Sequence, residues 1–299
     1  MELQDRVEEL QSAGIGVAAI SYDSKETLAA FAERRGITFP LLSDDDSSTI
    51  KEYGILNTVV AEGLGPNGND PEVVADVHRY VAAAVFDSPG LRRMINGTPF
   101  PGTFMIDGNS RVKSRFFEEF YRERATTSNV MLKSGIGLSP IAAVEGNTAQ
   151  LKFTAYPSDT VITNGSRFSL AVDIEPNSKM HVYAPGAEKK GYRVVELNMA
   201  PSDYFRFEAV EFPESEIYYF EPLDEYVPVF QKPFTISQEV IVEASAEIEK
   251  ELENIDALTL SGTLDYQACD DAICYLPVSV PVSFTLEFQT LDYQRTISR

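Results

Sequence analysis

The stretch LTLSGTLDYQACDDAICYLPVSVPVSFTLEF (residues 258–288) decides the fold of the C-terminal half of the chain. Apolar and polar residues alternate along 258–266 and again along 278–288, which is the period of a half-buried β-strand. Cys269 and Cys274 lie between these two runs. They can face each other only if the segment between them turns back tightly, which brings their Cα atoms within disulfide range. The stretch therefore predicts strands joined through a turn that permits a disulfide.

The same alternation extends upstream of this stretch. Residues 150–155, 167–174 and 235–244 alternate in the same way, and Pro, Gly and Asn turns separate them. Short alternating strands with turns between them are typical of an all-β sandwich. We expect this domain to occupy residues 148–299.

The N-terminal half shows a different pattern. Residues 2–13 have helical spacing, 15–20 form an apolar run, and Asp23-Ser24-Lys25-Glu26 resembles a capping box ahead of a helix that ends at Gly36. The acidic residues 44–46 are placed to begin another short helix. This alternation predicts an α/β domain with a mainly parallel sheet over residues 1–128.

Three further features define the domain organisation. Residues 57–97 interrupt the α/β rhythm and are interpreted as an insertion with an amphipathic helix at 73–81. Residues 104–107 and 112–117 are predicted as a β-hairpin. Residues 129–147 lose all periodicity, which is typical of a linker between domains.

Composition excludes several classes of function. The chain has 299 residues, 25 basic and 46 acidic side chains and a net charge of -21, which argues against nucleic acid and anionic membranes as partners. No apolar run is long enough to span a membrane. Two cysteines and two histidines exclude a four-cysteine zinc site, and we expect no cofactor.

Several motifs of the first half resemble the redoxin branch of the thioredoxin fold, the peroxiredoxin and alkyl-hydroperoxide-reductase type. They are residues 2–10, 16–24, 28–36, 39–44 and Pro101-Gly-Thr-Phe-Met-Ile-Asp107. The resemblance implies a thioredoxin-like domain in which Pro101, after a cis Phe100–Pro101 bond, faces the active site. Residues 1–128 contain no cysteine, so this domain as given has no thiolate to attack a peroxide. Since the family's cysteine segment would precede Met1, we expect an incomplete, truncated domain.

The second half carries the sharpest motif, Tyr266-Gln-Ala-Cys-Asp-Asp-Ala-Ile-Cys-Tyr-Leu-Pro277. With residues 180–186 and 227–230, it resembles the N-terminal periplasmic domain of the thiol:disulfide interchange protein DsbD. The resemblance implies an immunoglobulin-like sandwich in which Cys269 and Cys274 exchange electrons with thiol-disulfide partner proteins, among them a membrane-embedded donor. It also implies an extracytoplasmic location.

The surroundings of the cysteine pair are predicted residue by residue. The resemblance makes Phe212 the candidate cap over the pair, and Tyr183 a residue lining the same site. Tyr266 and Tyr275 are close enough in sequence to shield the sulfurs. Asp270 and Asp271 disfavour a thiolate by like charge.

Two other interpretations stay open. The cysteines could form a structural disulfide in a non-catalytic scaffold whose redoxin-like domain lacks its cysteines. A Cu(I) site built from both cysteines, Met180 and His181 is chemically possible, although no ligand spacing demands it.

Overall fold

The structure is a computed structural model that describes residues 2–80, 98–117, 123–136 and 140–290. The chain divides into two compact units, Met1–Thr127 and Ser128–Arg299. Each unit is described by itself. In the part of the chain that the structure describes, no helix is both long enough and apolar enough to cross a bilayer.

The first unit alternates helices with short strands, as predicted. Its elements are α1 (Glu2–Asp5), α2 (Val7–Ser12), β1 (Ala19–Ser21), α3 (Lys25–Arg35), β2 (Leu41–Ser43), α4 (Ser48–Glu52), α5 (Thr58–Leu64), α6 (Pro71–Tyr80), β3 (Gly102–Ile106), β4 (Val112–Phe117) and β5 (Arg124–Ala125). The helix expected in the insertion is α6, the insertion also contains α5, and its residues 81–97 lie outside the described residues.

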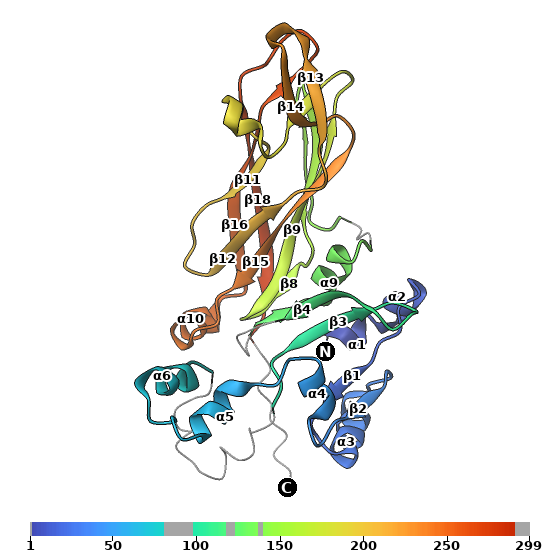
Figure 1. Cartoon of the computed structure of the whole chain (residues 1–299), viewed down its shortest axis with the longest axis vertical. Helices are drawn as coiled ribbons and strands as arrows, with labels where there is room; N and C mark the ends of the chain where they lie inside the picture. The colour runs from blue at the N-terminus through green and yellow to red at the C-terminus, as the bar shows by residue number, and fades with distance from the viewer. Residues whose placement is uncertain (1, 81–97, 118–122, 137–139, 291–299) are drawn as a thin grey trace. The chain divides into compact units, whose positions relative to one another are not determined.

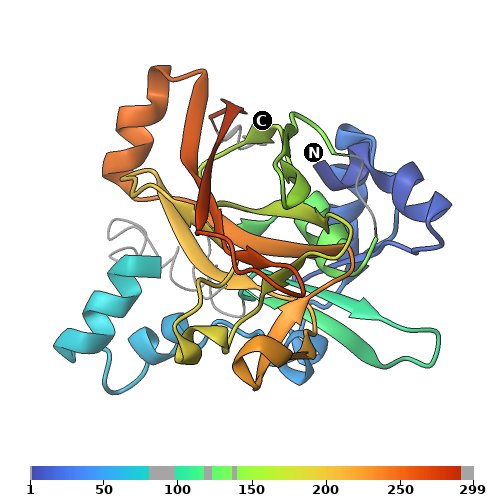
Figure 2. The ribbon, with the colours of Figure 1, turned by 90° about the horizontal axis from the view of Figure 1, so that it is seen from above.

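The four longer strands of this unit form two separate pairs instead of one mainly parallel sheet (Figure 1). Figure 2 shows the hairpin of β3 and β4 from above. Strands β1 and β2 are parallel, and β3 and β4 form the predicted antiparallel hairpin. Ile20 and Leu42, on the parallel pair, are 44% and 47% exposed. The apolar surface of this pair is therefore only partly covered by the described residues.

Helix starts in the first unit follow the predicted caps. The Ser24 side chain accepts a hydrogen bond from the Thr27 amide, and α3 ends at Gly36 with a φ of 64°. The Asp44 carboxylate accepts hydrogen bonds from the amides of Thr49 and Ile50 at 3.1 and 2.8 Å. Burial raises the pKa of Asp44, but these hydrogen bonds outweigh it and leave the pKa below its ordinary value.

The expected cis bond before Pro101 is wrong, because every described peptide bond is trans. The backbone on both sides of the proline is tied into extended pairing. Leu56 and Pro99 form a β-bridge, and the Phe100 amide donates to the Ile55 carbonyl at 2.6 Å. Strand β3 then begins at Gly102, so the chain passes through Pro101 in an extended conformation.

The second unit is built from strands. Its elements are α9 (Thr127–Lys133, which starts at the boundary), β6 (Val144–Asn147), β7 (Leu151–Pro157), β8 (Val161–Ile162), β9 (Ser166–Pro176), β10 (His181–Tyr183), β11 (Glu196–Met199), β12 (Phe205–Glu211), β13 (Glu216–Phe220), β14 (Glu225–Phe230), β15 (Phe234–Val242), α10 (Ala246–Glu251), β16 (Ala257–Tyr266), β17 (Ala268–Cys269) and β18 (Val278–Phe288), with 3₁₀ turns at 187–190, 221–223 and 252–254. The strands predicted from alternation are β7, β9, β15, β16 and β18.

Two sheets of this unit share one hydrophobic core. One has the order β12-β15-β9-β7-β6, and the other has the order β11-β16-β18-β8. Their inward rows, including Phe168, Ile236, Leu264 and Phe284, are almost fully buried in the same cluster. The alternation read from the sequence therefore identifies the core-facing rows of a two-layered all-β unit.

A third, smaller sheet carries the cysteines. Its order is β13-β14-β10-β17, and all its described pairings are antiparallel. Figure 1 shows β13 and β14 at one end of the second unit and α10 at the other. The short strands β10 and β17 place His181 and Cys269 opposite each other in register.

The segment predicted as a linker is partly regular structure. Its first residues belong to α9, where the fully buried Asn129 accepts a hydrogen bond from the Ser169 hydroxyl at 2.8 Å. Its last residues form β6, which pairs with β7. Both elements are hydrogen-bonded within the second unit, so the boundary between the units lies at Thr127 and Ser128, at the start of α9.

We expect Gly262→Ala to destabilise the second unit by about 1–3 kcal/mol, because an added methyl group has no room there. A Cβ on Gly262 would lie 2.4 Å from the Asn198 carbonyl oxygen and 2.9 Å from Met199 Cα on the edge strand β11. Chemical denaturation followed by circular dichroism measures the effect. The exposed Ser283→Ala on β18 is the control, with an expected change below about 0.5 kcal/mol. Equal stability of the two variants would contradict the packing described here.

Candidate functional site

The cysteine pair closes a tight hairpin after β17. Cys269 and Cys274 form a disulfide with their Cα atoms 4.2 Å apart. The hydrogen bonds on either side are Asp270 amide to Ile273 carbonyl and Tyr275 amide to Ala268 carbonyl, both 3.0 Å. The cysteines are therefore a directly opposed pair between two ladder bonds, the position where cross-strand side chains lie closest.

Asp270 holds the turn in shape. Its Oδ1 accepts hydrogen bonds from the amides of Ala272 and Ile273 at 2.8 and 2.7 Å, and its Oδ2 accepts one from the Tyr275 hydroxyl at 3.0 Å. These bonds, the Ala272 amide first, lower the pKa of Asp270. The carboxylate thus stabilises the hairpin that keeps the two cysteines opposed.

Tyr183 is the residue that contacts both sulfurs. Its hydroxyl oxygen lies 2.9 Å from Cys269 Sγ and 3.3 Å from Cys274 Sγ. Sulfurs in a disulfide carry no proton, so the hydroxyl is the donor. Burial, with the neighbouring Tyr192 and Glu225, raises the pKa of Tyr183 far above its ordinary value. Tyr183 therefore stays protonated and can donate a hydrogen bond to a sulfur in every redox state.

Two more tyrosines complete the wall around the pair. The Tyr192 ring stacks on Tyr183 with a centroid distance of 4.1 Å, and its hydroxyl donates to Glu225. The Tyr218 hydroxyl donates to Asp271 at 2.8 Å. Burial is the main reason that the pKa of both tyrosines is raised. Both rings belong to a small cluster with the buried Cys269 and the partly buried Cys274, separate from the main core.

The two sulfurs differ in access. Cys269 is 0% exposed, whereas Cys274 is only partly buried. Next to Cys274 the surface is apolar, because Ile273 is 57% and Leu276 is 86% exposed. A groove of about 630 Å³ adjoins this region, and Gln267 and Pro277, from either side of the hairpin, contribute to its lining. An incoming group can therefore reach Cys274 more readily than Cys269.

Tyr266 and Tyr275, predicted to shield the sulfurs, have other contacts. Tyr266 is fully buried in the main core, and its hydroxyl donates to Thr148 Oγ1 at 2.8 Å. Tyr275 is bonded to Asp270, as described above. Tyr266 lies three residues before Cys269, and side chains an odd number of positions apart in a strand project to opposite faces. Neither tyrosine is among the described neighbours of the cysteine cluster.

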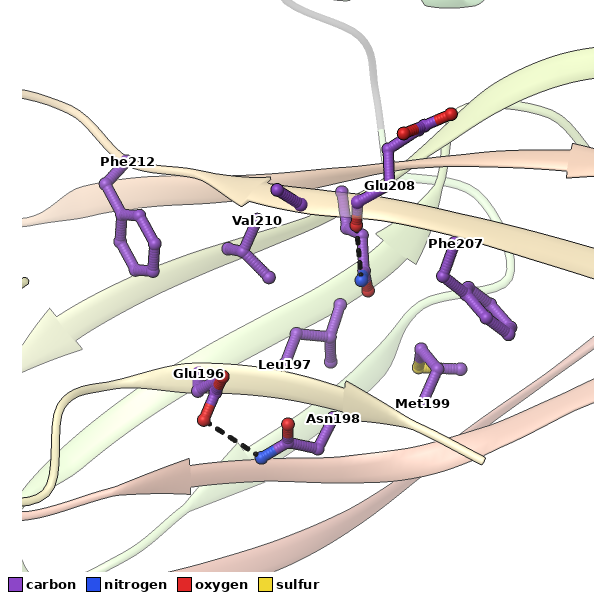
Figure 3. A pocket seen from close by; sticks show the side chains of 10 residues that line it. Glu196, Leu197, Asn198, Met199, Phe207, Glu208, Val210 and Phe212 are labelled. Atoms are coloured by element: carbon purple, nitrogen blue, oxygen red, sulfur yellow. Dashed lines mark hydrogen bonds between the residues drawn. The ribbon is translucent and has the colours of Figure 1, made fainter. Parts of the chain in front are cut away.

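Phe212, the predicted cap, is not part of the cysteine cluster, but it lines the groove of about 630 Å³ together with Tyr192, Gln267 and Pro277. Phe212 follows β12 and packs against the main core. Figure 3 shows Val210 and Phe212 pointing toward β11, where they line a groove of about 340 Å³ between the edge strands β11 and β12. Among the described residues, the aromatic rings in the cysteine cluster are those of Tyr183, Tyr192 and Tyr218. Pro101 precedes β3 in the first unit, and the site described here is built from the second unit.

His181 is the most unusual polar residue of the site. It is 1% exposed, and neither ring nitrogen has a hydrogen-bond partner. Its ring lies against Tyr218 with a centroid distance of 4.4 Å and meets the edge of Tyr183 at 5.7 Å. Burial lowers its pKa below 6.5, although the carboxylates of Asp271 and Asp270 act in the opposite direction. His181 is therefore a buried, neutral imidazole beside the disulfide.

This burial predicts a pH-dependent stability. Because the pKa of His181 is lowered on folding, the unfolded chain binds a proton below pH 6.5 that the folded chain does not. We expect the wild type to lose stability relative to His181→Phe as the pH falls below 6.5, by at most about 1.4 kcal/mol per pH unit. Denaturant titrations of both proteins between pH 7.5 and pH 5 measure this, with His78→Asn as the matched histidine control. Parallel stability curves for wild type and His181→Phe would contradict it.

The described residues contain no group of three or more His, Cys, Asp or Glu side chains that could hold a metal ion. The copper interpretation placed His181, Met180 and both cysteines in one ligand set. In the structure the two cysteines are bonded to each other, and free cysteines are absent from the described residues. In this state the two cysteine sulfurs are bonded to each other and do not form a ligand set with His181 and Met180.

Three residues near the cysteine pair were not predicted from the sequence to surround it: Tyr192, Tyr218 and Gln267. Gln267 lies within the cysteine motif, and it donates to the Tyr275 carbonyl and accepts from the Arg193 amide. Tyr192 and Tyr218 come from segments more than fifty residues upstream of the hairpin. Nothing local in the sequence marks them, because their position depends on loop paths and on the β13-β14-β10 register.

Residues 1–115 match the AhpC/TSA family, which confirms the redoxin resemblance of the first half. The peroxiredoxin Bcp of Escherichia coli is 42% identical over 53 residues, a span of 18% of this chain and 34% of that protein. The chain thus spans about a third of the length of this curated relative.

Among solved structures, the N-terminal domain of Neisseria meningitidis DsbD in the reduced form aligns with a TM-score of 0.27 and 15% identity, over 40% of this chain and 82% of that one. The N-terminal periplasmic domain of ScsB from Proteus mirabilis aligns with a TM-score of 0.31 and 12% identity, over 47% of each chain. Scores this low do not identify a function.

Proposed function

We propose that the second unit is a thiol-disulfide exchange module and that the Cys269–Cys274 pair is its reactive group. The observation that carries this proposal is the Tyr183 hydroxyl, which lies within hydrogen-bond distance of both sulfurs in a buried cluster. A donor in this position stabilises the thiolate that every exchange step produces, by about 1.5–3 kcal/mol for a hydrogen bond to a charged group.

The difference in access assigns a role to each sulfur. A partner thiolate attacks the partly buried Cys274 Sγ, the Cys269–Cys274 bond breaks, and Cys269 leaves as a thiolate held by Tyr183. Cys269 then resolves the mixed disulfide by the reverse attack, or a second partner thiol completes the reduction of the pair. Cys274 is thus the partner-facing sulfur, and Cys269 is the resolving sulfur.

The alternative is a structural disulfide in a scaffold that has no chemistry of its own. The absence of cysteine from residues 1–128 favours it, because the first unit as given supplies no thiol. However, the bond joins residues only five apart, in a turn that Asp270 already holds. Closing so short a loop contributes about 2 kcal/mol, against about 4.7 kcal/mol for a loop of 100 residues. A structural role therefore explains the bond less well than exchange does.

The wider setting follows from this assignment. We propose that the β unit is immunoglobulin-like and works in an extracytoplasmic compartment, where a disulfide of this kind persists. Its partners are thiol-disulfide proteins, a membrane-embedded electron donor among them. The match of residues 1–115 to AhpC/TSA proteins supports a redoxin as one of these partners.

Reaction with glutathione tests the assignment of the two sulfurs. Oxidised protein is mixed with reduced glutathione, quenched with acid at short times and mapped by mass spectrometry. We expect the glutathione adduct on Cys274, because Cys269 is 0% exposed. An adduct mainly on Cys269 would reverse the assignment of the two sulfurs, and a disulfide that resists glutathione until the protein is unfolded would support the scaffold instead.

A further inference from the structure

The buried imidazole of His181 has no role in the exchange steps described above. It lies on β10 directly across from Cys269 on β17, as a register pair of antiparallel strands. Side chains of such a pair project to the same face of the sheet, with Cβ atoms about 4.5–5.5 Å apart. His181 is thus a cross-strand neighbour of the less accessible sulfur.

The two ring nitrogens of His181 are without a partner while the disulfide is intact. Leaving a buried polar group unpaired costs about 1–3 kcal/mol, so such a residue needs an explanation. Reduction of the disulfide supplies one, because it creates a thiol on Cys269 that can rotate and donate its proton. The nearest polar hydroxyls do not compete for the ring, since Tyr183 donates to the sulfurs and Tyr218 donates to Asp271.

We propose that His181 accepts the proton of the Cys269 thiol when this thiol resolves a mixed disulfide on Cys274. The inference rests on the proposed exchange function and deepens it. Cys269 is fully buried, and a bare thiolate there is costly, so a neighbouring base lets attack and proton loss occur together. His181 serves as that base because it is neutral and adjacent in register.

The step balances without a further reactant. Cys269 Sγ attacks Cys274 Sγ, the Cys269–Cys274 bond forms, and the bond from Cys274 to the partner sulfur breaks. The partner sulfur leaves with the electron pair and is reduced, while the cysteine pair is oxidised. The proton from Cys269 moves to a ring nitrogen of His181 and passes from there to the departing thiolate or to solvent.

The charged and titratable groups around the ring fit this role. From the hairpin, the carboxylates of Asp270 and Asp271 act on the ring, and both favour its protonated form. From β13, Tyr218 lies against the ring, and from β10 itself, Tyr183 meets it edge-on. The two carboxylates thus lower the cost of the imidazolium that forms for a moment next to Cys269.

The test isolates the resolving step. The reduced full chain is mixed rapidly with glutathione disulfide, and the decay of the transient Cys274–glutathione adduct through attack by Cys269 is followed by acid quenching between pH 5 and pH 9. We expect His181→Phe to slow release about tenfold at pH 7, with a difference from wild type that narrows toward pH 9, because rising pH populates the Cys269 thiolate without help from a base. His181→Gln, which keeps a polar group but does not titrate, should show the same loss of the low-pH activity. His78→Gln, which removes the exposed histidine on α6 of the first unit, is the matched control and should retain the wild-type profile.

The outcomes separate this inference from the proposed function. If wild type releases glutathione and a folded His181 variant has the same pH profile, the inference fails and the exchange function stands. If wild type releases no glutathione at any pH, both fail. If His181→Phe does not fold, His181→Gln decides in the same way, because only the loss of proton transfer changes the shape of the pH profile.

Discussion

Replacing Cys269 with serine is expected to trap the protein as a stable mixed disulfide through Cys274, whereas Cys274→Ser is expected to abolish reaction with partner thiols and disulfides. Cys274 is partly buried and bordered by exposed apolar side chains, and Cys269 is 0% exposed. Without Cys269, an adduct on Cys274 has no resolving thiol. Without Cys274, the remaining thiol is that of Cys269, which a partner cannot reach because the side chain is 0% exposed.

Non-reducing electrophoresis and intact-mass measurement distinguish these outcomes, with glutathione disulfide as the probe. We expect one glutathione per chain on Cys269→Ser, no adduct on Cys274→Ser, and a transient adduct on the reduced wild type. The double serine variant controls for reaction elsewhere. The reverse pattern, with a stable adduct on Cys274→Ser, would contradict the assignment of the two sulfurs.

The second large effect is expected from Tyr183→Phe. This change removes the hydroxyl that lies within hydrogen-bond distance of both sulfurs and leaves the ring in place. A hydrogen bond to a charged group contributes about 1.5–3 kcal/mol, so the rate of reduction of the disulfide by glutathione at pH 7 should fall about 10- to 100-fold. Stopped-flow or quenched kinetics measure the rate.

Tyr192→Phe is the matched control for this variant. Tyr192 stacks on Tyr183, but its hydroxyl donates to Glu225 and not to sulfur. Removing the Tyr192 hydroxyl tests whether the loss of any hydroxyl from this cluster is enough to slow the reaction of the disulfide with glutathione. If the two variants reacted at equal rates, the hydrogen bond from Tyr183 would have no part in the chemistry.

The strands of the second unit could be predicted from sequence because their inward rows repeat every second residue. In β16, for example, Leu258, Leu260, Leu264 and Tyr266 are all buried. The hairpin turn could also be predicted, because Cys269 and Cys274 are only five positions apart and can face each other only across a tight turn. Local patterns of this kind are sufficient when one face of an element meets one core.

The walls of the site could not be predicted in the same way. The contact between Tyr218 and His181 depends on the pairing of β13 with β14 and of β14 with β10. A one-residue slip in either pairing would turn the Tyr218 ring to the other face of the sheet. Phe212 is predicted as the cap from resemblance alone, and the structure places it in the lining of two grooves, one beside β11 and one that Gln267 and Pro277 also line. Side chains near the cysteines in sequence, such as Tyr266, are drawn into the main core by the strand that carries them.

The reduction potential of the Cys269–Cys274 pair tests the central claim most directly. The protein is equilibrated with graded glutathione or dithiothreitol buffers, and free thiols are counted by alkylation and mass spectrometry. An exchange pair with an accessible sulfur and a donor on its thiolate should have a potential above about -300 mV. A potential well below that value, with no exchange at equilibrium with glutathione, would identify a structural bridge and contradict the account.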